Sequence, residues 1–374
     1  MQASSGTTAS LLAALGELVA EAVPLSGALA PRPARAAHLA GVAMRLRPRD
    51  LAHLRSAARR AHSAAQLGRP TIAARTMLIR RRVAAAGRLD GVVQRGSEMR
   101  LPRGTHLVTL DDSTVLQAWH AYPWPHLQGF SPRDLERYSE RQRRIFRSAV
   151  ACCCATHWVA ESIAGDYGIA RERVFTVGFG QNHATPAPAQ RDWSSPRYLF
   201  VGMDWERKNG DAVLAAFARV RERHPDATLD LVGGHPRVEQ PGVRGHGELS
   251  LLDDADRERM ASLYGTATAF VMPSLHEPAG IVYAEAGAAG VPSIGTTSGG
   301  AATMIGRGGL VVDPVDGDQL LAAMLTLADP DTARRMGELA RSHAALFTWR
   351  KVAERVVRAM ALPGLDTSGL ADFL

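Results

Sequence analysis

The sequence predicts an α/β protein built from two doubly wound, Rossmann-like domains. Short apolar runs of strand length alternate with longer amphipathic stretches, which is the pattern of parallel sheets covered by helices. The chain has 374 residues, enough for two ordinary domains. A stretch rich in Pro, Ser and Ala at 186–196 separates the two halves. We therefore predict a first domain at 1–188, a second at 197–345, and a terminal helical segment at 346–374.

The first half is predicted to open with a helix, which a serine or threonine in Ser4–Thr8 would cap. Residues 28–88 are expected to be mostly helical, and a helix at 131–150 begins with Ser131 as its cap and Pro132 as its first residue. Cys152, Cys153 and Cys154 are expected to be small buried residues in or next to a strand, with no disulfide. Strands are predicted at 22–25, 91–94, 106–110, 157–160 and 174–178.

The second half repeats the alternation. Strands are predicted at 198–201, 228–232, 269–272, 292–295 and 310–312. Helices are predicted at 211–223, 253–264, 281–289, 317–328 and 331–346, with a last helix from about Phe347 to Ala361. Asp254 and Asp256 resemble a metal-binding Asp-x-Asp pair, but acids also favour the first turn of a helix, and we prefer that interpretation.

Two glutamates and several glycines are concentrated between Met272 and Pro314. Glu277 follows a predicted strand, and Glu285 lies two turns further on, along the next helix, so both acids are expected to face one crevice at the carboxyl edge of a sheet. Gly299 and Gly300 follow the next strand, where backbone amides often approach a phosphate. This stretch therefore predicts carboxylates for sugar hydroxyls and amides for a diphosphate.

The same stretch closely resembles the signature of the retaining glycosyltransferases of family 4, which have the GT-B fold of two Rossmann-like domains facing a cleft. The matching residues are Pro273, Ser274, Glu277, Gly280, Glu285, Gly290, Pro292, Gly299 and Gly300. The resemblance extends over about 90–361 and includes Phe347–Trp349, where terminal helices of this family return to the first domain. It implies transfer of a sugar from a nucleotide-diphosphate donor to an acceptor hydroxyl with retention of anomeric configuration.

The resemblance also assigns roles to residues. Glu277 would contact the donor sugar and Glu285 the ribose hydroxyls, and Lys208 matches a lysine that binds the donor diphosphate. The usual arginine after Gly202 is replaced by Met203, and Arg207 is our candidate for the second positive charge. The remaining donor-side candidates are Gly202, Pro278, Ala279, Gly280, Ile281 and Val282.

Three further candidates lie on the acceptor or donor-sugar side of the first domain: Gly6, Asp112 and His120. Asp112 ends a predicted strand, where acids are common at ligand crevices, although capping of the next helix is an equally open interpretation. His126 competes with His120, and no motif selects between them. The family usually begins one strand earlier than this chain, so a start upstream is our expectation. No metal and no cofactor are expected.

Charge is uneven along the chain. The net charge is +7, yet residues 31–104 hold 17 arginines against three acids. Such an excess indicates either a solvated surface or attraction to an anionic membrane, and a basic amphipathic helix at 71–86 would suit the second. No nucleic-acid-binding signature is present, so we predict no nucleic-acid partner. We expect a cytoplasmic protein, with peripheral contact to the inner face of a membrane as an option, and a glycan, lipid or small-molecule acceptor.

Two alternatives to glycosyltransfer stay open. A GT-B-type nucleotide-sugar epimerase or hydrolase would consume donor without an acceptor. A degenerate, non-catalytic binding protein of the same fold would bind donor and turn nothing over. Met203 and the short N-terminal segment favour degeneracy, whereas the Glu277 and Glu285 pair argues against it.

Overall fold

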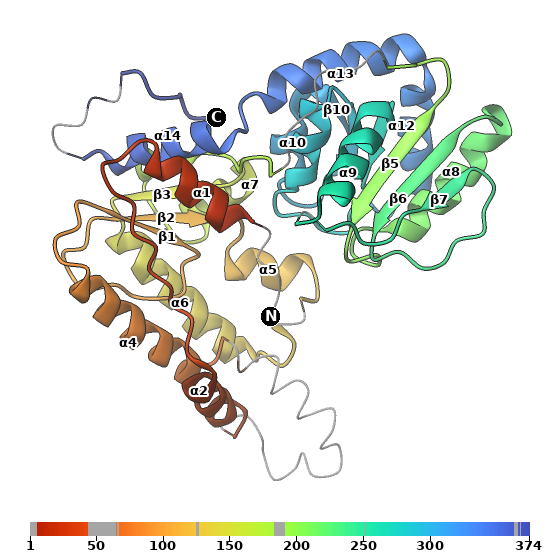
Figure 1. Ribbon diagram of the computed structural model, residues 1–374. Helices are drawn as coiled ribbons and strands as arrows, with labels where there is room; N and C mark the ends of the chain where they lie inside the picture. The colour runs from red at the N-terminus through yellow and green to blue at the C-terminus, as the bar shows by residue number, and fades with distance from the viewer. Residues whose placement is uncertain are drawn as a thin grey trace, which may run out of the picture.

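The computed structural model describes residues 6–43, 65, 67–124, 127–182, 191–250, 252–362, 366 and 368–374. These residues form two parallel sheets, each flanked by helices, and the two α/β units lie side by side (Figure 1). The α/β class and the GT-B arrangement predicted from the sequence are confirmed. None of the described helices combines the length and apolar character that crossing a bilayer requires.

The first sheet has the order β1-β2-β3-β4 within the described residues, and all its strands are parallel. Its strands are β1 (Val92–Arg95), β2 (Leu107–Asp111), β3 (Ala151–Cys154) and β4 (Val174–Thr176). Its helices are α1 (Thr7–Gly16), α2 (Pro31–Ala43), α4 (Arg69–Ala85), α5 (Val115–Ala121), α6 (Pro132–Ser148) and α7 (His157–Gly165). The three cysteines occupy β3, where they are buried and unbridged, as predicted.

The second sheet has the order β10-β9-β8-β5-β6-β7. Its strands are β5 (Arg197–Gly202), β6 (Thr228–Gly233), β7 (Val243–Gly245), β8 (Ala269–Val271), β9 (Ser293–Thr296) and β10 (Gly309–Val312). Its helices are α8 (Gly210–Arg223), α9 (Asp254–Thr266), α10 (Ile281–Ala288), α11 (Ala301–Ile305), α12 (Gly317–Ala328) and α13 (Pro330–Ala344). Asp254 and Asp256 lie in the first turn of α9, as the helix-dipole interpretation predicts.

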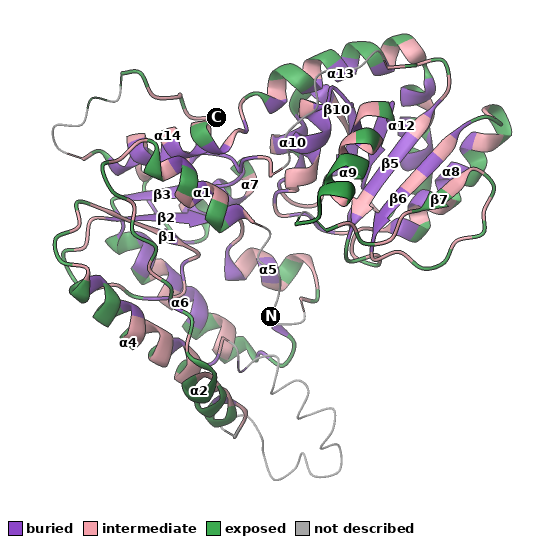
Figure 2. Cartoon of the chain, in the orientation of Figure 1, coloured by how far each residue is buried: buried purple, intermediate pink, exposed green. Residues whose placement is uncertain are grey.

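Helix α14 (Trp349–Met360) returns to the first domain after the second has been completed. It packs on α1, and its Trp349, Val352 and Val356 belong to the same buried cluster as Leu11 and Val108. Figure 2 shows the buried strands at the centre of each unit and the exposed faces of the outer helices. The C-terminal helix is therefore part of the first domain, although it follows the second domain in the sequence.

Three local predictions were wrong. Residues 157–160 form the start of α7 and not a strand, because Val159, Ala160 and Ile163 are buried at helical spacing. Residues 22–25 form no strand, and Leu25 instead packs beside α4. The cap of α1 is Gly6, in a left-handed conformation with φ of 69°, and not a serine or threonine side chain. By contrast, Ser131 and Pro132 begin α6 as predicted.

Candidate functional site

The strand order of the second sheet reverses between β8 and β5. From β5 the order runs one way to β6 and β7, and the later strands β8, β9 and β10 lie on the other side. Ligands of open α/β sheets bind beyond the carboxyl ends of the strands at such a switch point. The loop after β5 holds Arg207 and Lys208, and the loop after β8 holds Glu277. Sequence motifs far apart in the chain therefore meet at the edge where a ligand is expected.

Both cations converge on one carboxylate oxygen. The Lys208 ammonium contacts Glu277 Oε2, and Arg207 Nη1 lies 3.5 Å from the same oxygen. Arg207 Nη1 also donates to the His276 carbonyl at 3.0 Å, and Arg207 Nε lies 3.2 Å from Asp204 Oδ2. All three central side chains are largely buried, at 14%, 11% and 8% exposure for Arg207, Lys208 and Glu277. This is a compact, partly dehydrated cluster in which two cations, Arg207 and Lys208, are balanced by the carboxylates of Glu277 and Asp204.

The backbone around the cluster explains why a glycine and an asparagine occur there. A Cβ at Gly202 would lie 2.7 Å from Lys208 Cγ, so the lysine side chain crosses the strand end only because residue 202 has none. Asn209 adopts a left-handed conformation with φ of 64°, which asparagine tolerates better than most residues. Its Nδ2 donates to the carbonyls of Pro273 and Pro314 at 3.1 and 2.7 Å. These bonds hold the Lys208 loop against the Glu277 loop.

The electrostatics keep Glu277 ionised. Burial raises the pKa of its carboxyl, but the charges of Lys208 and Arg207 outweigh burial and leave that pKa below its ordinary value. Burial also lowers the pKa of Lys208, and Glu277 opposes this shift. Burial lowers the pKa of the neighbouring His276 to about 4, so its imidazole is neutral at pH 7. An anionic ligand would therefore meet two cations already held in place by the carboxylates of Glu277 and Asp204.

Gly299 and Gly300 have a different role from the one predicted. The Gly300 amide donates to the Glu277 carbonyl at 2.8 Å, so it is not available to a phosphate in this state. A Cβ at Gly299, where φ is 109°, would lie 2.2 Å from the Glu277 carbonyl oxygen. The glycines let the β9 loop pack backbone to backbone against the Glu277 loop. The sequence correctly indicated that another group approaches the backbone closely at these glycines. We predicted that this group is a ligand phosphate, whereas in the structure it is the Glu277 loop.

Glu285 lies on α10 and is buried. Its Oε1 accepts from the Asn182 amide and its Oε2 from the Tyr264 hydroxyl, each at 3.2 Å. Gly6 lies beside Asn182, since a Cβ at Gly6 would be 3.9 Å from that side chain. The second acid thus sits where the interdomain segment, the loop before α1 and α10 meet, and its two oxygens are oriented by protein partners.

The loop from Pro278 to Val282 joins the two domains. Ala279 belongs to the buried cluster of the first domain, and Ile281 packs against that cluster, whereas Val282 packs on the core of the second. Thr156 donates from its hydroxyl to the Pro278 carbonyl at 3.3 Å. Gly280 has φ of 81°, and a Cβ there would lie 2.5 Å from the Tyr283 ring. The donor-side candidates therefore lie directly at the domain interface.

Sequence reasoning missed an aromatic cluster over the site. The His276 ring packs edge-on against Trp124 and Trp158, with centroids 6.0 and 5.1 Å apart, and Arg207 lies 5.2 Å above the Trp124 ring. His276 is 1% exposed, and its Nε2 has no hydrogen-bond partner among the described residues. The density of aromatic residues at 117–130 was the available signal. It marked the right segment without indicating that it crosses to the other domain.

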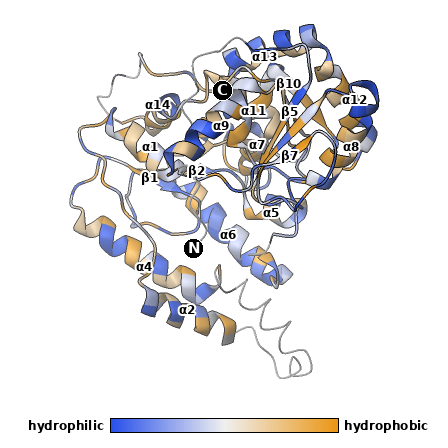
Figure 3. Cartoon of the chain, turned by 45° about the vertical axis from the view of Figure 1, so that its right-hand side comes forward, coloured by the Kyte–Doolittle hydropathy of each residue, from blue (hydrophilic) through white to orange (hydrophobic). Residues whose placement is uncertain are grey.

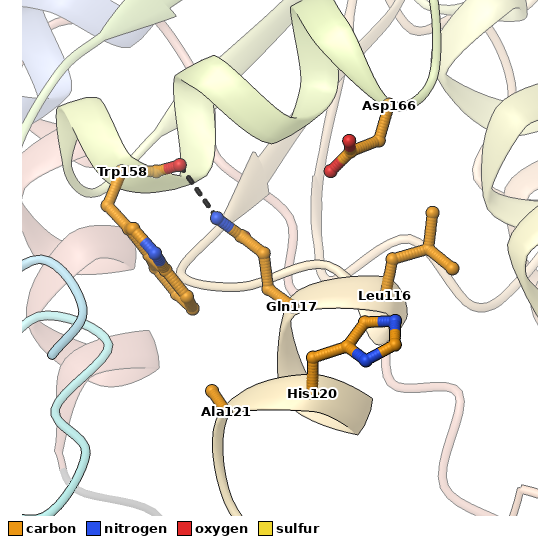
Figure 4. A pocket seen from close by; sticks show the side chains of 6 residues that line it. All are labelled: Leu116, Gln117, His120, Ala121, Trp158 and Asp166. Carbon is orange, nitrogen blue, oxygen red and sulfur yellow. Dashed lines mark hydrogen bonds between the residues drawn. The ribbon is translucent and has the colours of Figure 1, made fainter.

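The first-domain candidates do not form one cluster. Asp112 follows β2; burial raises its pKa, Arg95 opposes the shift, and the Glu277 charge raises the pKa further. Thr114, and not Asp112, caps α5. His120 is exposed at the edge of a shallow hollow with Leu116, Gln117, Ala121, Trp158 and Asp166 (Figure 4). His126 lies outside the described residues.

No group of three or more His, Cys, Asp or Glu side chains in the described part of the chain is placed to hold a metal ion. The expectation that the chain needs no metal stays a prediction, because ligand-assisted sites use substrate oxygens as well as protein ones.

Comparison with known proteins agrees with this geometry. Residues 195–329 match the family model described as glycosyl transferases group 1. The matched residues run from the start of β5 to the end of α12 and include Arg207, Lys208, Glu277 and Glu285.

The similarity to that family is therefore shown for residues 195–329. The chain is 33% identical over 231 residues to a D-inositol 3-phosphate glycosyltransferase of Corynebacterium urealyticum, a match covering 54% of each chain. A GDP-mannose-dependent α-(1-6)-phosphatidylinositol monomannoside mannosyltransferase of Mycolicibacterium smegmatis is 35% identical over 161 residues, covering 38% of this chain and 41% of that protein. The chain spans about half the length of the curated relatives it matches.

The fold comparison extends beyond the group 1 domain. Sucrose-phosphate synthase from Thermosynechococcus elongatus aligns with a TM-score of 0.58 and 22% identity, covering 77% of each chain. At that identity the likeness shows the fold alone, and it includes both domains.

Proposed function

We propose that the chain is a retaining glycosyltransferase that moves a sugar from a nucleotide-diphosphate donor to an acceptor hydroxyl. The single observation that carries this proposal is the convergence of Lys208 and Arg207 on Glu277 at the switch point of the second sheet. A diphosphate leaving group accumulates negative charge, which two preorganised cations stabilise. The relatives named as glycosyltransferases support the same conclusion.

Each residue has a defined part in this proposal. When the diphosphate binds, Lys208 and Arg207 form ion pairs with it instead of with Glu277. The Glu277 carboxylate can then hydrogen-bond to the donor sugar and stabilise positive charge on the sugar ring as the glycosidic bond lengthens. Glu285, oriented by Tyr264 and Asn182, binds the ribose hydroxyls through its remaining acceptor capacity. The neutral His276 adds no competing charge beside the sugar.

The acceptor is a hydroxyl of a glycan, a lipid or a small molecule, and it approaches from the first domain. Asp112 is the candidate there, because its carboxyl interacts electrostatically with Glu277 across the interface. Gly6 would place the α1 loop beside the donor, close to Asn182. A cytoplasmic location remains part of the proposal.

The test is a transfer assay with GDP-, UDP- and ADP-sugars and a mixed set of hydroxyl acceptors, in which NMR reports the anomeric configuration of the product. GDP-mannose is the first donor to try, since a relative is named as dependent on it. Retained configuration and loss of product in Glu277→Gln would support the proposal. Product formation at near wild-type rate in that variant would refute the role of Glu277.

The same assay distinguishes the alternatives. An epimerase or hydrolase would consume donor at equal rate with and without acceptor. A non-catalytic binding protein would bind donor and consume none, and one observation favours it: Met203, which stands where the family has an arginine, is 61% exposed and contributes no charge. Restoring that residue with Met203→Arg would then be expected to tighten donor binding without creating transfer.

A further inference from the structure

Helices α2 and α4 form a pair at the end of the first domain farthest from the second (Figure 1). The inner face of α4 anchors the pair, since Ile79 and Val83 pack with Met99 in a small buried cluster. Arg75 is also tied to the body through Glu98 at 2.7 Å. Because these residues face the sheet, the opposite side of α4 is left to solvent.

The outer side of this pair is strongly basic. Neither helix contains an acidic residue. Arg32 and Arg35 on α2, and Arg80 and Arg81 on α4, are exposed, and none of them forms an ion pair with another described residue. Other described arginines do form ion pairs, as Arg144 does with Glu140. The charge of these four arginines is therefore not compensated by any other described residue.

Apolar side chains are interspersed with these arginines. Leu39 on α2 and Met77 on α4 are each 55% exposed. Leu39 follows Arg35 by four residues, and Met77 precedes Arg80 and Arg81 by three and four, so each apolar residue shares a helix face with arginines. Single exposed apolar residues are ordinary, but Leu39 and Met77 place apolar side chains next to the arginines of two adjacent helices. Figure 3 shows hydrophobic and hydrophilic residues alternating along this pair.

We propose that this surface docks the protein on an anionic lipid bilayer. The α2–α4 surface is defined as Arg32, Arg35, Leu39, Met77, Arg80 and Arg81. The arginines would pair with lipid phosphates, while Leu39 and Met77 enter the level of the upper acyl chains. The inference concerns where the protein works, and it stands whether or not the transferase proposal holds.

A bilayer fits this surface better than a nucleic acid does. Proteins that hold single strands stack bases on aromatic rings, and neither α2 nor α4 contains Phe, Tyr or Trp. Phosphate contacts alone would also give no role to Leu39 and Met77. A flat, mixed basic and apolar surface is what a headgroup layer above acyl chains complements.

The experiment is flotation of the full chain with two kinds of vesicle, one of pure phosphatidylcholine and one that also contains 30 mol% phosphatidylglycerol. We expect binding to the anionic vesicles that weakens as salt increases. Each arginine near an anionic surface contributes roughly fivefold to the binding constant, so Arg80→Ala with Arg81→Ala should weaken binding about 25-fold. Leu39→Ser with Met77→Ser should weaken it about tenfold without changing the salt dependence.

A matched control exists on the second domain. Arg334 and Arg335 are adjacent, exposed residues of α13 with no ion pair to another described residue, so the change of both to Ala removes the same charge elsewhere. We expect this control to bind vesicles within twofold of wild type. Equal loss in the control would show that net charge alone drives binding and would overturn the assignment.

Two other outcomes would overturn the proposal. Equal binding to both vesicle types would remove the electrostatic contribution of the arginines. Tighter binding to duplex DNA or RNA than to anionic vesicles, unchanged by Leu39→Ser with Met77→Ser, would assign the surface to nucleic acid. Circular dichroism confirms that the variants are folded. The shift in melting temperature on adding GDP or UDP should be the same in these variants as in the wild type. That measurement separates failure of this proposal from failure of the donor site.

Discussion

The two domains differ in how well their buried ionisable side chains are paired. In the second domain, Lys208 and Arg207 neutralise Glu277 at the sheet edge, and every one of these charges has an opposite partner. In the first domain, Asp111 is buried at the end of β2, where the Ser97 hydroxyl donates to its Oδ1 at 2.9 Å and its Oδ2 has no hydrogen-bond partner among the described residues. The comparison teaches that the charges of the second-domain cluster satisfy one another, whereas the first domain buries a carboxyl, that of Asp111, which the described residues leave incompletely satisfied.

The largest effect that tests this comparison is expected from Glu277→Gln. Removing the carboxylate should lower transfer about a thousandfold, roughly 4 kcal/mol in the barrier, because it deletes the charge opposite the developing positive ring. Nucleoside-diphosphate binding should be retained or tightened, since Lys208 and Arg207 lose their competitor. Steady-state rates and calorimetric binding of GDP or UDP measure the two quantities. Parallel loss of both would contradict the division of roles.

The second effect concerns Asp111. Burial raises its pKa from 3.8 to about 7, so the folded state prefers the neutral acid. Stability from this preference is fully present below pH 4 and is lost as the pH rises towards 7, a difference of up to about 4 kcal/mol at 1.36 kcal/mol per unit. Asp111→Asn keeps the acceptor for Ser97 and cannot ionise. We expect it to add about 3 kcal/mol to the free energy of unfolding at pH 8.

The measurement is denaturant unfolding of the wild type and Asp111→Asn between pH 5 and pH 8. The difference between the two proteins should grow with pH. Ser97→Ala provides a control, since it removes the hydrogen bond that Asp111→Asn keeps and leaves the acid. A difference that stays constant across this range would show that Asp111 does not titrate there.

A smaller effect is expected at Gly202. In Gly202→Ala the new methyl would lie 2.7 Å from Lys208 Cγ and would displace the ammonium from the cluster. Donor binding should weaken about tenfold, or 1.4 kcal/mol, with little loss of stability, because the clash is with a flexible side chain and not with backbone. Calorimetry with the preferred nucleotide measures it. Gly317→Ala is the matched control, since a Cβ there meets no atom within 4 Å.

The smallest effect tests a first-domain feature unrelated to charge burial. The Ser131 hydroxyl accepts from the Asp134 amide at 3.2 Å and caps α6. Ser131→Ala should cost about 1 kcal/mol of stability, at every pH between 5 and 8. Thermal unfolding at two pH values checks this, and a pH-dependent cost would show that the cap is coupled to the Asp111 network.

Much of the second domain was predictable because its determinants are local. The strand, the turn and the helix around Glu277 follow one another in sequence, so the motif places them without tertiary knowledge. The first domain was harder. His157 begins a helix whose first four residues have strand-like composition, and only burial at Ile163 shows the helical period.

The site itself was predictable as a set of positions and less so as a set of contacts. Lys208 and Glu277 were each assigned to the donor from motif positions, without a predicted contact between them, and the Gly300 amide, predicted for a phosphate, donates to the Glu277 carbonyl. Trp124 and Trp158 reach His276 only because the domains meet there. Contacts between segments more than a hundred residues apart carry no local signal in a single sequence.

The most direct test of the central claim is calorimetric titration of the full chain with GDP-, UDP- and ADP-sugars, repeated with Lys208→Met and with the control Lys351→Met on α14. The account predicts that one nucleotide class binds, that Lys208→Met weakens it at least thirtyfold, and that Lys351→Met leaves it unchanged. Donor binding of equal strength in Lys208→Met would contradict a donor site at the Lys208–Arg207–Glu277 cluster.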